Sequence, residues 1–249
     1  MPNICRVPGT ELAYEFLPGA GPAVVFCPGY ASHMQGTKAL ALEAWCKQAG
    51  RAMLRFDYAG HGESGGAFVD GCIGDWAEDA AFVVEQVVPG QEIVLVGTSM
   101  GGWIALLLGR SLGERLRGML LIAPAPDFTE ALIRPQLNPE TLEMLRTKGV
   151  IYPPSAYGEP LPLTWKLLEE GAQHLLLGGP ISITCPVRIL HGMRDADVPW
   201  KLSLKLVECL DSEDVRLTYV KAGDHRLSTP EDLALLCRNL AALLGQDGA

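Results

Sequence analysis

Short apolar segments that alternate with longer amphipathic ones are the feature of this chain that most restricts its fold. Seven segments have the length and composition of β-strands, and from the second onward they are almost continuously apolar. Such runs are typical of strands that are covered on both faces, as in a parallel sheet. The strand candidates are Ala13–Leu17, Ala23–Cys27, Ala52–Phe56, Glu92–Val96, Gly118–Ala123, Val187–Leu190 and Val215–Val220.

The segments between these strands are amphipathic and have the length of helices. The helix candidates are Thr37–Gln48, Asp75–Val88, Met100–Leu112, Lys201–Leu210 and Glu231–Leu244. Alternation of strands and helices predicts an α/β fold with a mostly parallel, doubly wound sheet of about eight strands. Polar and apolar residues alternate in the first strand candidate, so we expect it to start an antiparallel hairpin at the edge of the sheet.

Residues 127–182 interrupt the alternation, because no clear buried strand occurs there. The prolines of this segment are Pro135, Pro139, Pro153, Pro154, Pro160, Pro162 and Pro180. Helix-like patches lie near Glu140–Lys148 and Leu163–Leu176. A plain loop of this length is uncommon inside a compact domain. We therefore predict a helical cap, residues 127–182, inserted into a core formed by residues 1–126 and 183–249.

Composition and charge exclude several classes of protein. Of the 249 residues, 48% are hydrophobic and 20% are charged, which favours a folded core over disorder. The net charge of -9 argues against binding to nucleic acids and anionic membranes, which requires a basic surface. No apolar run reaches the roughly 18 residues of a membrane span. We expect neither a nucleic-acid partner nor stable membrane insertion.

The cysteines and the N-terminal residues bear on compartment and cofactor. The seven cysteines are scattered and form no CxxC pair, so a reducing compartment fits better than a disulfide framework. The first residues resemble neither a signal peptide nor a transit peptide. The sequence contains no HExxH and completes no phosphate-loop pattern. We therefore expect no metal and no cofactor.

A GxSxG pattern stands between a predicted strand and a predicted helix, as Gly97-Thr98-Ser99-Met100-Gly101. In this position it is typical of the nucleophile elbow, a sharp turn that presents a serine hydroxyl above the carboxyl edge of the sheet. Side chains two positions before and after the serine would collide with the turn, which explains both glycines. We predict that Ser99 is a nucleophile. The alternative is a chance match in a chain with 28 glycines.

A serine nucleophile needs a base and an acid that orients it. With this elbow the usual order is serine, acid, histidine, and the histidine follows the last strand. Of the five histidines, only His225 has this place. Two aspartates follow the preceding strand, and the common pattern HGxxDxxVP selects Asp195. Asp197 would then cap the next helix, although the reverse assignment stays open. His191 would support the turn.

Two loops complete the candidate site. The oxyanion hole would use the amide of Met100 and a second amide from the turn after the strand Ala23–Cys27, for which Tyr30 is our candidate. The loop that begins at Asp57 has the pattern DxxGxGxS, whose glycines and aspartate we interpret as structural. His61 of this loop either packs there or lines the pocket.

With Ser99, Asp195 and His225 in this order, the chain resembles the α/β-hydrolase superfamily. Further segments resemble one branch of it, the mitochondrial palmitoyl-protein thioesterases, also known as mycophenolic acid acyl-glucuronide esterases, with their bacterial relatives. These segments are Pro28-Gly29-Tyr30, Gly36-Thr37-Lys38-Ala39-Leu40, Arg55-Phe56-Asp57-Tyr58, Ser99-Met100-Gly101-Gly102-Trp103, Lys148-Gly149-Val150, His191-Gly192-Met193-Arg194-Asp195 and Asp224-His225-Arg226. The animal enzymes carry a mitochondrial leader. We expect a bacterial cytoplasmic location for this chain, or the mitochondrial matrix if a leader was removed.

The resemblance implies hydrolysis of acyl thioesters or esters, on small molecules or on acylated (palmitoylated) proteins. A general carboxylesterase acting on small or acyl-glucuronide-type esters, and a cap-bearing C–C hydrolase, would use the same triad. Outside enzymes, a binding protein with this fold is the alternative. The apolar cap residues, with Tyr152 and Trp165 as the substrate-binding candidates, would cover an acyl chain or only seal the cap. These cap residues are Ile151, Tyr152, Pro153, Pro154, Tyr157, Trp165 and Leu168.

Overall fold

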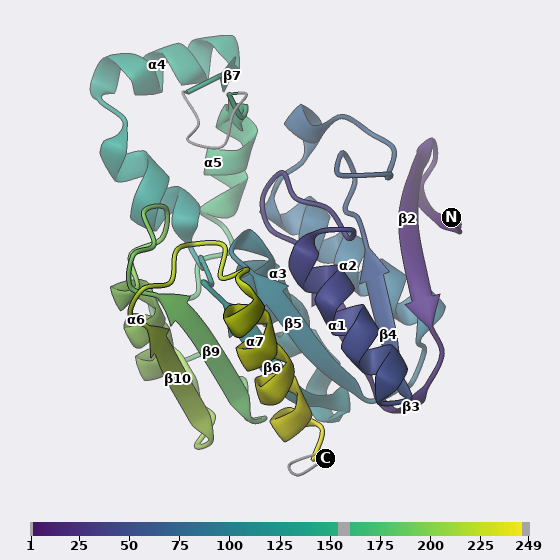
Figure 1. Ribbon diagram of the computed structural model, residues 1–249. Helices are drawn as coiled ribbons and strands as arrows, with labels where there is room; N and C mark the ends of the chain where they lie inside the picture. Colours follow the sequence, from purple (N-terminus) through teal and green to yellow (C-terminus); the bar gives the residue numbers. More distant parts are fainter. Residues whose placement is uncertain (1, 154–159, 246–249) are drawn as a thin grey trace.

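An eight-stranded sheet forms the centre of the molecule (Figure 1). The computed structural model describes residues 2–153 and 160–245. The strands of this sheet are β1 (Asn3–Val7), β2 (Thr10–Leu17), β3 (Ala20–Cys27), β4 (Arg51–Phe56), β5 (Ile93–Thr98), β6 (Leu116–Ile122), β9 (Val187–Gly192) and β10 (Val215–Val220). Their spatial order is β1-β2-β4-β3-β5-β6-β9-β10. The pairs β1–β2 and β2–β4 are antiparallel, and all other neighbours are parallel. The predicted mostly parallel α/β sheet is confirmed.

Helices cover both faces of this sheet. They are α1 (Thr37–Gln48), α2 (Ile73–Val87), α3 (Met100–Leu112), α6 (Lys201–Cys209) and α7 (Pro230–Leu243), with short 3₁₀ turns η1 (Phe68–Asp70) and η2 (Gly113–Arg115). Successive residues of a strand point to opposite faces. Accordingly Val25 lies in the core beneath α2, α3 and α6, whereas Val24 and Phe26 lie in the core beneath α1 and α7. Figure 1 looks onto the face that α1 and α7 cover.

The N-terminal edge differs in one respect from the expectation. The hairpin already begins with β1, so the run from Ala13 belongs to its second strand and does not start it. Residues of β1 alternate between exposed and half-buried. An edge strand with so little buried surface has a weak apolar signal, which explains why the sequence pattern missed it.

The described residues of the predicted cap, 127–153 and 160–182, form an irregular, partly helical segment that Figure 1 shows beyond one end of the sheet. Its elements are the π-helix η3 (Thr129–Ile133), the 3₁₀ turn η4 (Arg134–Gln136), α4 (Pro139–Lys148), β7 (Val150–Ile151), β8 (Leu163–Thr164) and α5 (Trp165–Gly171). We refer to this segment as the cap. Its buried side chains, among them Leu145, Leu167 and Leu168, belong to the same hydrophobic core as α2 and α3.

The second predicted patch of the cap is shorter as a helix than expected. Leu163 and Thr164 pair with β7 in a two-stranded sheet, and α5 starts only at Trp165. The Thr164 side chain accepts a hydrogen bond from the Leu167 amide at 3.0 Å. A threonine in this capping position fixes the start of a helix, because it satisfies one of the free amides of the first turn.

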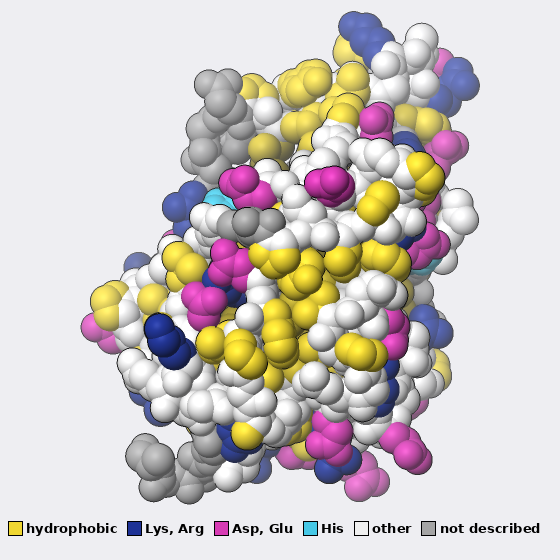
Figure 2. All heavy atoms as spheres, turned by 90° about the vertical axis from the view of Figure 1, so that its right-hand side faces the viewer, with side chains coloured by type: hydrophobic (Ala, Val, Ile, Leu, Met, Phe, Trp, Pro, Cys, Tyr) yellow, Lys and Arg dark blue, Asp and Glu magenta, His cyan; other side chains and the backbone are white. Residues whose placement is uncertain are grey.

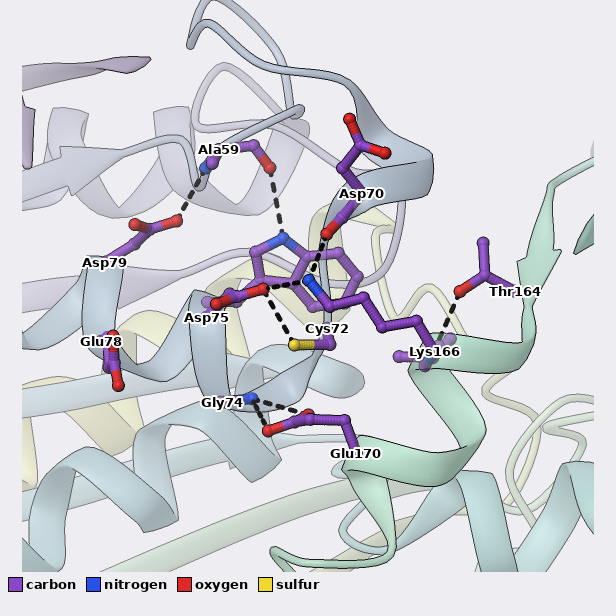
Figure 3. A network of polar contacts seen from close by, with 12 residues as sticks. Ala59, Asp70, Cys72, Gly74, Asp75, Glu78, Asp79, Thr164, Lys166 and Glu170 are labelled. Atoms are coloured by element: carbon purple, nitrogen blue, oxygen red, sulfur yellow. Dashed lines mark hydrogen bonds and ion pairs between the residues drawn. The ribbon is translucent and has the colours of Figure 1, made fainter. Parts of the chain in front are cut away.

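Polar contacts fasten α5 to the start of α2 (Figure 3). Lys166 Nζ donates to the Asp70 carbonyl at 2.6 Å and to Asp75 Oδ2 at 2.7 Å. Both carboxylate oxygens of Glu170 accept the Gly74 amide at 3.0 Å. The Glu170 carboxylate thus lies at a helix N-terminus, where the free amides favour negative charge. These contacts give the cap a defined position on the core.

Two further contacts join the end of the cap to the core. Trp103 Nε1 in α3 donates to the His174 carbonyl at 3.1 Å. The Asp127 carboxylate accepts the amides of Leu176 and Leu177, each at 2.8 Å. Burial raises the pKa of Asp127, while these two hydrogen bonds oppose the rise. The residue that opens the cap thereby binds the chain where the cap returns to the core.

Charged side chains of both signs are distributed over the surface. On the face drawn in Figure 2, hydrophobic side chains gather in a band across the middle, and acidic and basic groups lie around it. Among residues 2–153 and 160–245, no helix has both the length and the hydrophobicity required to cross a membrane. All seven cysteines are unpaired.

Candidate active site

Ser99 occupies a strained turn between β5 and α3. Its backbone has φ 54° and ψ -122°, a conformation that non-glycine residues rarely adopt. A Cβ atom on Gly97 would lie 2.4 Å from the Gly101 carbonyl oxygen. A Cβ atom on Gly101 would lie 2.1 Å from the carbonyl oxygen of Cys27 at the end of β3. Only glycine at these two positions allows α3 to start so close to β3 and β5.

Three side chains distant in sequence form one chain of hydrogen bonds at this turn. His225 Nε2 lies 3.1 Å from Ser99 Oγ, and His225 Nδ1 lies 2.7 Å from Asp195 Oδ2. An ionised carboxylate only accepts hydrogen bonds, so Nδ1 carries the proton and donates to Asp195. Nε2 is then unprotonated and accepts the hydroxyl proton of Ser99. The residues selected from sequence order alone therefore lie within hydrogen-bond distance of one another.

The Asp195 carboxylate is fully buried and accepts hydrogen bonds at both oxygens. Oδ1 accepts the amides of Asp197 at 2.9 Å and Val198 at 2.8 Å. Oδ2 accepts from His225 and from His191 Nε2, at 2.7 and 3.1 Å. Burial alone would raise the pKa of Asp195, but the hydrogen bonds from His191 and His225 hold it well below its ordinary value. The group therefore stays a carboxylate at neutral pH.

His191 on β9 is a fully buried neighbour of this carboxylate. Its Nε2 faces two acceptors, Asp195 Oδ2 and the Val198 carbonyl at 3.0 Å, so Nε2 carries the proton. Its Nδ1 lies 2.7 Å from Ser203 Oγ and accepts the hydroxyl proton. The predicted support of the turn thus takes the form of a hydrogen bond to the acidic residue itself, which the sequence did not indicate.

Asp197 does not cap the following helix, so that prediction was wrong. Helix α6 has Trp200 at its N-cap position, and no side chain caps it. The amide of Asp197 donates to Asp195, and Asp197 lines a cavity beside Ser99. Between β9 and α6, the backbone amides of Asp197 and Val198 donate to the Asp195 carboxylate. Asp195, and not Asp197, therefore provides the side-chain acceptor in this turn.

Two backbone amides lie next to Ser99. Met100 follows Ser99 in the chain, and Tyr30 belongs to a turn that packs against it. Met100 is the first residue of α3, so its N–H has no acceptor within the helix. The turn that carries Tyr30 packs closely on the elbow, because a Cβ atom on Gly29 would lie 3.4 Å from Ser99 Cβ. Tyr30 and Met100 both line a cavity with Ser99. Neither amide donates to another residue of the described chain.

Ser99 lies where two cavities meet. The first, of about 440 Å³, lies beneath the cap and is mostly apolar. Its apolar lining includes Met100, Ala125, Phe128, Leu132, Ile133, Leu137, Pro153, Leu161, Leu163 and Val198. The second, of about 450 Å³, is more polar and extends toward the start of α1. Tyr30, Ser99, Leu161 and His225 line both cavities.

The structure does not bring the two predicted substrate-binding residues to these cavities. Tyr152 is 60% exposed and lines neither of them. Trp165 stacks beside the Arg134 guanidinium, 5.9 Å from its ring centre, and also lines neither. Pro154 and Tyr157 lie outside the described residues. The cavity wall comes instead from η3 and the residues beside it. The apolar residues Phe128, Leu132 and Ile133 have helical spacing, which is the sequence signal for this wall.

His61 and Cys27 have structural surroundings. His61 is buried among Tyr58, Phe68 and Trp76, and lines neither cavity. Burial lowers the pKa of His61 to about 4, so the ring is neutral. Burial raises the pKa of the Cys27 thiol to about 12, which makes it a poor nucleophile.

Within the described residues, one cluster has side chains of the type that hold metal ions: Asp195, Asp197 and His225. Two of these groups already bind each other, and the remaining hydrogen-bond capacity of Asp195 is used by amides and His191. This arrangement suits proton transfer between an oriented histidine and a hydroxyl.

Known proteins similar to this chain agree with the geometry. A family model described as serine aminopeptidase, S33 (Hydrolase_4) matches residues 20–170. The human mitochondrial palmitoyl-protein thioesterase ABHD10 is 37% identical over 236 residues, which cover 94% of this chain and 76% of that protein. The chain belongs to the α/β-hydrolase superfamily. This confirms the resemblance inferred from its motifs.

Solved structures extend the likeness of this α/β-hydrolase to the whole fold. A putative hydrolase from Agrobacterium vitis S4 superposes with a TM-score of 0.92 at 41% identity, covering 98% of this chain and 97% of that one. The α/β hydrolase domain-containing protein 10 from mouse has a TM-score of 0.90 at 35% identity, covering 99% of both chains. The chain is therefore related to ABHD10 over nearly all of its own residues.

The elbow of the hydrolase yields a prediction about stability. Gly101→Ala places a methyl group against two carbonyl oxygens, of Cys27 and Pro28, at 2.1 and 2.4 Å. Because backbone has to move, we expect the free energy of unfolding to fall by about 3 kcal/mol, measured by urea denaturation. Gly178→Ala is the control, since no atom lies within 4 Å of a Cβ there. Equal midpoints for the two variants would contradict the steric argument.

Proposed function

We propose that this α/β-hydrolase is a serine hydrolase that cleaves acyl thioesters or esters through an acyl-enzyme intermediate. The observation that carries the proposal is the hydrogen-bonded chain from Ser99 through His225 to Asp195 at the elbow. A serine hydroxyl is a weak nucleophile until a base accepts its proton. Here the base is oriented by a buried carboxylate that stays ionised, and Ser99 and His225 both border cavities able to hold a substrate.

In the first half of the proposed reaction, His225 Nε2 takes the hydroxyl proton while Ser99 Oγ bonds to the acyl carbon. The amides of Met100 and Tyr30 stabilise the resulting oxyanion. Losing one such donor typically costs about 3–4 kcal/mol of transition-state stabilisation. The bond to the leaving group then breaks, and His225 passes its proton to the departing sulfur or oxygen.

In the second half, water attacks the acyl carbon of the acyl-enzyme. His225 removes a proton from this water and returns it to Ser99 Oγ as the ester bond breaks and the fatty acid leaves. Asp195 stabilises the positive charge on His225 in both halves. The residues of the chain supply every proton that moves except those of water, so the reaction needs neither metal nor cofactor.

We propose a long acyl chain as the group transferred, which makes the enzyme an acyl-protein (palmitoyl) thioesterase-like hydrolase. Two observations support this choice. The first cavity is lined mostly by aliphatic and aromatic side chains, and the relatives at 37% identity are named palmitoyl-protein thioesterases. A general carboxylesterase would use the same three residues and differ in the length of acyl group it prefers.

We propose a reducing compartment for the protein, in line with its seven unpaired cysteines. The bacterial cytoplasm and the mitochondrial matrix are both such compartments, and the human relative named mitochondrial supports the second.

Replacement of the nucleophile is the first test of the proposed reaction. Ser99→Ala removes the attacking oxygen, so we expect turnover of acyl thioesters to fall about 10⁵-fold or more while the fold is retained. Labelling with a fluorophosphonate probe checks the same point, since the probe bonds to an activated serine. Ser111→Ala on α3 is the control and should label like the wild type. A folded wild-type chain that takes no label would favour the binding-protein alternative.

The length of the acyl group separates the thioesterase from the general esterase. We expect kcat/KM to rise about fourfold per CH₂ group, equivalent to about 0.8 kcal/mol, until the first cavity is filled. A series of thioesters from acetyl to palmitoyl with one leaving group measures this. Leu132→Trp should shorten the longest chain accepted, whereas Leu204→Trp at an exposed position should not. A maximum at acetyl would contradict the long-chain proposal.

His191 is proposed as a positioning residue that acts through Asp195. In His191→Phe the carboxylate loses one donor and attracts the imidazolium of His225 more strongly. We expect kcat/KM at pH 7 to fall about tenfold, or about 1.4 kcal/mol, the magnitude of one charge-assisted hydrogen bond. The acidic limb of the pH–rate profile should move to higher pH. His191→Gln retains a donor and should recover part of the loss. An unmoved acidic limb would reduce His191 to a packing role.

A further inference from the structure

The second cavity holds a group of side chains that the proposed acyl chain does not use. It is bordered by the turn after β3, the first residues of α1 and the loop that follows His225. A bound ester extends in two directions from its carbonyl carbon, the acyl chain in one and the leaving group in the other. If the acyl chain occupies the apolar cavity, the leaving group lies in the second cavity, since the two meet at Ser99.

The charge of this second cavity is opposite to that of the protein. Its lining contains Lys38 and Arg226 and no aspartate or glutamate among the described residues. The whole chain has 29 acidic and 20 basic residues, which gives a net charge of -9. A cavity next to a nucleophile that carries only cationic charged groups is suited to a substrate with negative charge.

Lys38 is the more enclosed of the two cations. Its Nζ donates to the Arg226 carbonyl at 2.5 Å and to Ser228 Oγ at 3.5 Å, and all three residues line the cavity. Within the described chain no carboxylate lies within ion-pair distance of this ammonium. An ammonium has three protons, so one remains for a ligand after these two contacts.

The nearby carboxylates are engaged elsewhere. Asp224 accepts the amides of Arg226 and Leu227, each at 3.0 Å. Asp232 caps the start of α7 together with Thr229. Burial lowers the pKa of Lys38, and the attraction of Asp224 only partly opposes this effect. An anion from a ligand would relieve the cost of keeping the ammonium charged in a half-buried place.

We propose that the second cavity is the leaving-group subsite and that Lys38, with Arg226 beside it, selects thioesters and esters whose leaving group carries a carboxylate or phosphate near the scissile bond. The inference rests on the proposed function, because it assigns one cavity to the acyl chain. It adds a specificity-determining residue that does not take part in the chemistry of Ser99.

Lys38 has a second effect that the experiment has to separate. Its hydrogen bond to the Arg226 carbonyl holds the loop that carries His225. Loss of that bond would lower turnover of every substrate by the same factor. Selection by charge changes the ratio between substrates, so the ratio of two kcat/KM values for the same variant isolates it.

The test uses octanoyl thioesters that differ only in the leaving thiol. Two are anionic, from 3-mercaptopropionate and 2-mercaptoethyl phosphate, one is neutral, from 3-mercaptopropionamide, and one is cationic, from thiocholine, whose quaternary ammonium cannot attack the thioester. For the wild-type chain we expect kcat/KM to be about tenfold higher for the anions than for the neutral amide, and lowest for the cation. The two anionic thiols distinguish a carboxylate from a phosphate preference. The ratio should fall as salt is added.

In Lys38→Gln the ratio of kcat/KM for the anionic thioesters to kcat/KM for the neutral one should fall close to one. Arg226→Gln should lower this ratio less. Lys47→Gln is the matched control, because it removes the same charge from the exposed far end of α1 and should leave the ratio unchanged. A wild-type ratio near one, or an equal loss for all four thioesters in Lys38→Gln, would overturn the inference. Failure of the wild-type chain to cleave any of them would instead refute the proposed function.

Discussion

The close approach of three backbone segments around Ser99 is the constraint on which the site depends. Helix α3 starts against the ends of β3 and β5 because Gly97 and Gly101 have no side chains in the contact. This approach forces Ser99 into its strained conformation and holds the turn of Tyr30 against it. A strained backbone conformation persists only where the surrounding structure holds it in place. Here the buried parallel strands next to the turn hold it.

On the other side of the site, Asp195 holds several segments together. It organises its own loop through the amides of Asp197 and Val198, and it binds one histidine on β9 and another after β10. A buried carboxylate is stable only when such donors surround it. The same donors that keep it ionised also fix its orientation, so the structural and the electrostatic requirements coincide in one residue.

The sequence predicted the regular elements better than the cap. The bounds of α1 and α3 agree to the residue, because glycines that flank them mark where they start and end. Ser99, Asp195 and His225 follow strands of a parallel sheet, whose carboxyl ends share one edge, so their proximity follows from topology. Tyr152 belongs to an irregular segment, where the direction of a side chain depends on tertiary contacts that no local pattern encodes. The prediction that Asp197 caps α6 was wrong for the same reason, since the contacts of this turn depend on the tertiary position of Asp195.

Tyr30 connects the two halves of the molecule. Its backbone belongs to the turn beside Ser99, its ring packs edge-on against Phe68 and Phe128, and its hydroxyl donates to the Pro162 carbonyl of the cap at 2.5 Å. A shift of the cap at Pro162 therefore has to break this bond or pull on the turn that packs against Ser99. Breaking it would remove a hydrogen bond of a half-buried hydroxyl, at a cost of about 1 kcal/mol. The position of the cap and the geometry around Ser99 are thus mechanically coupled through one side chain.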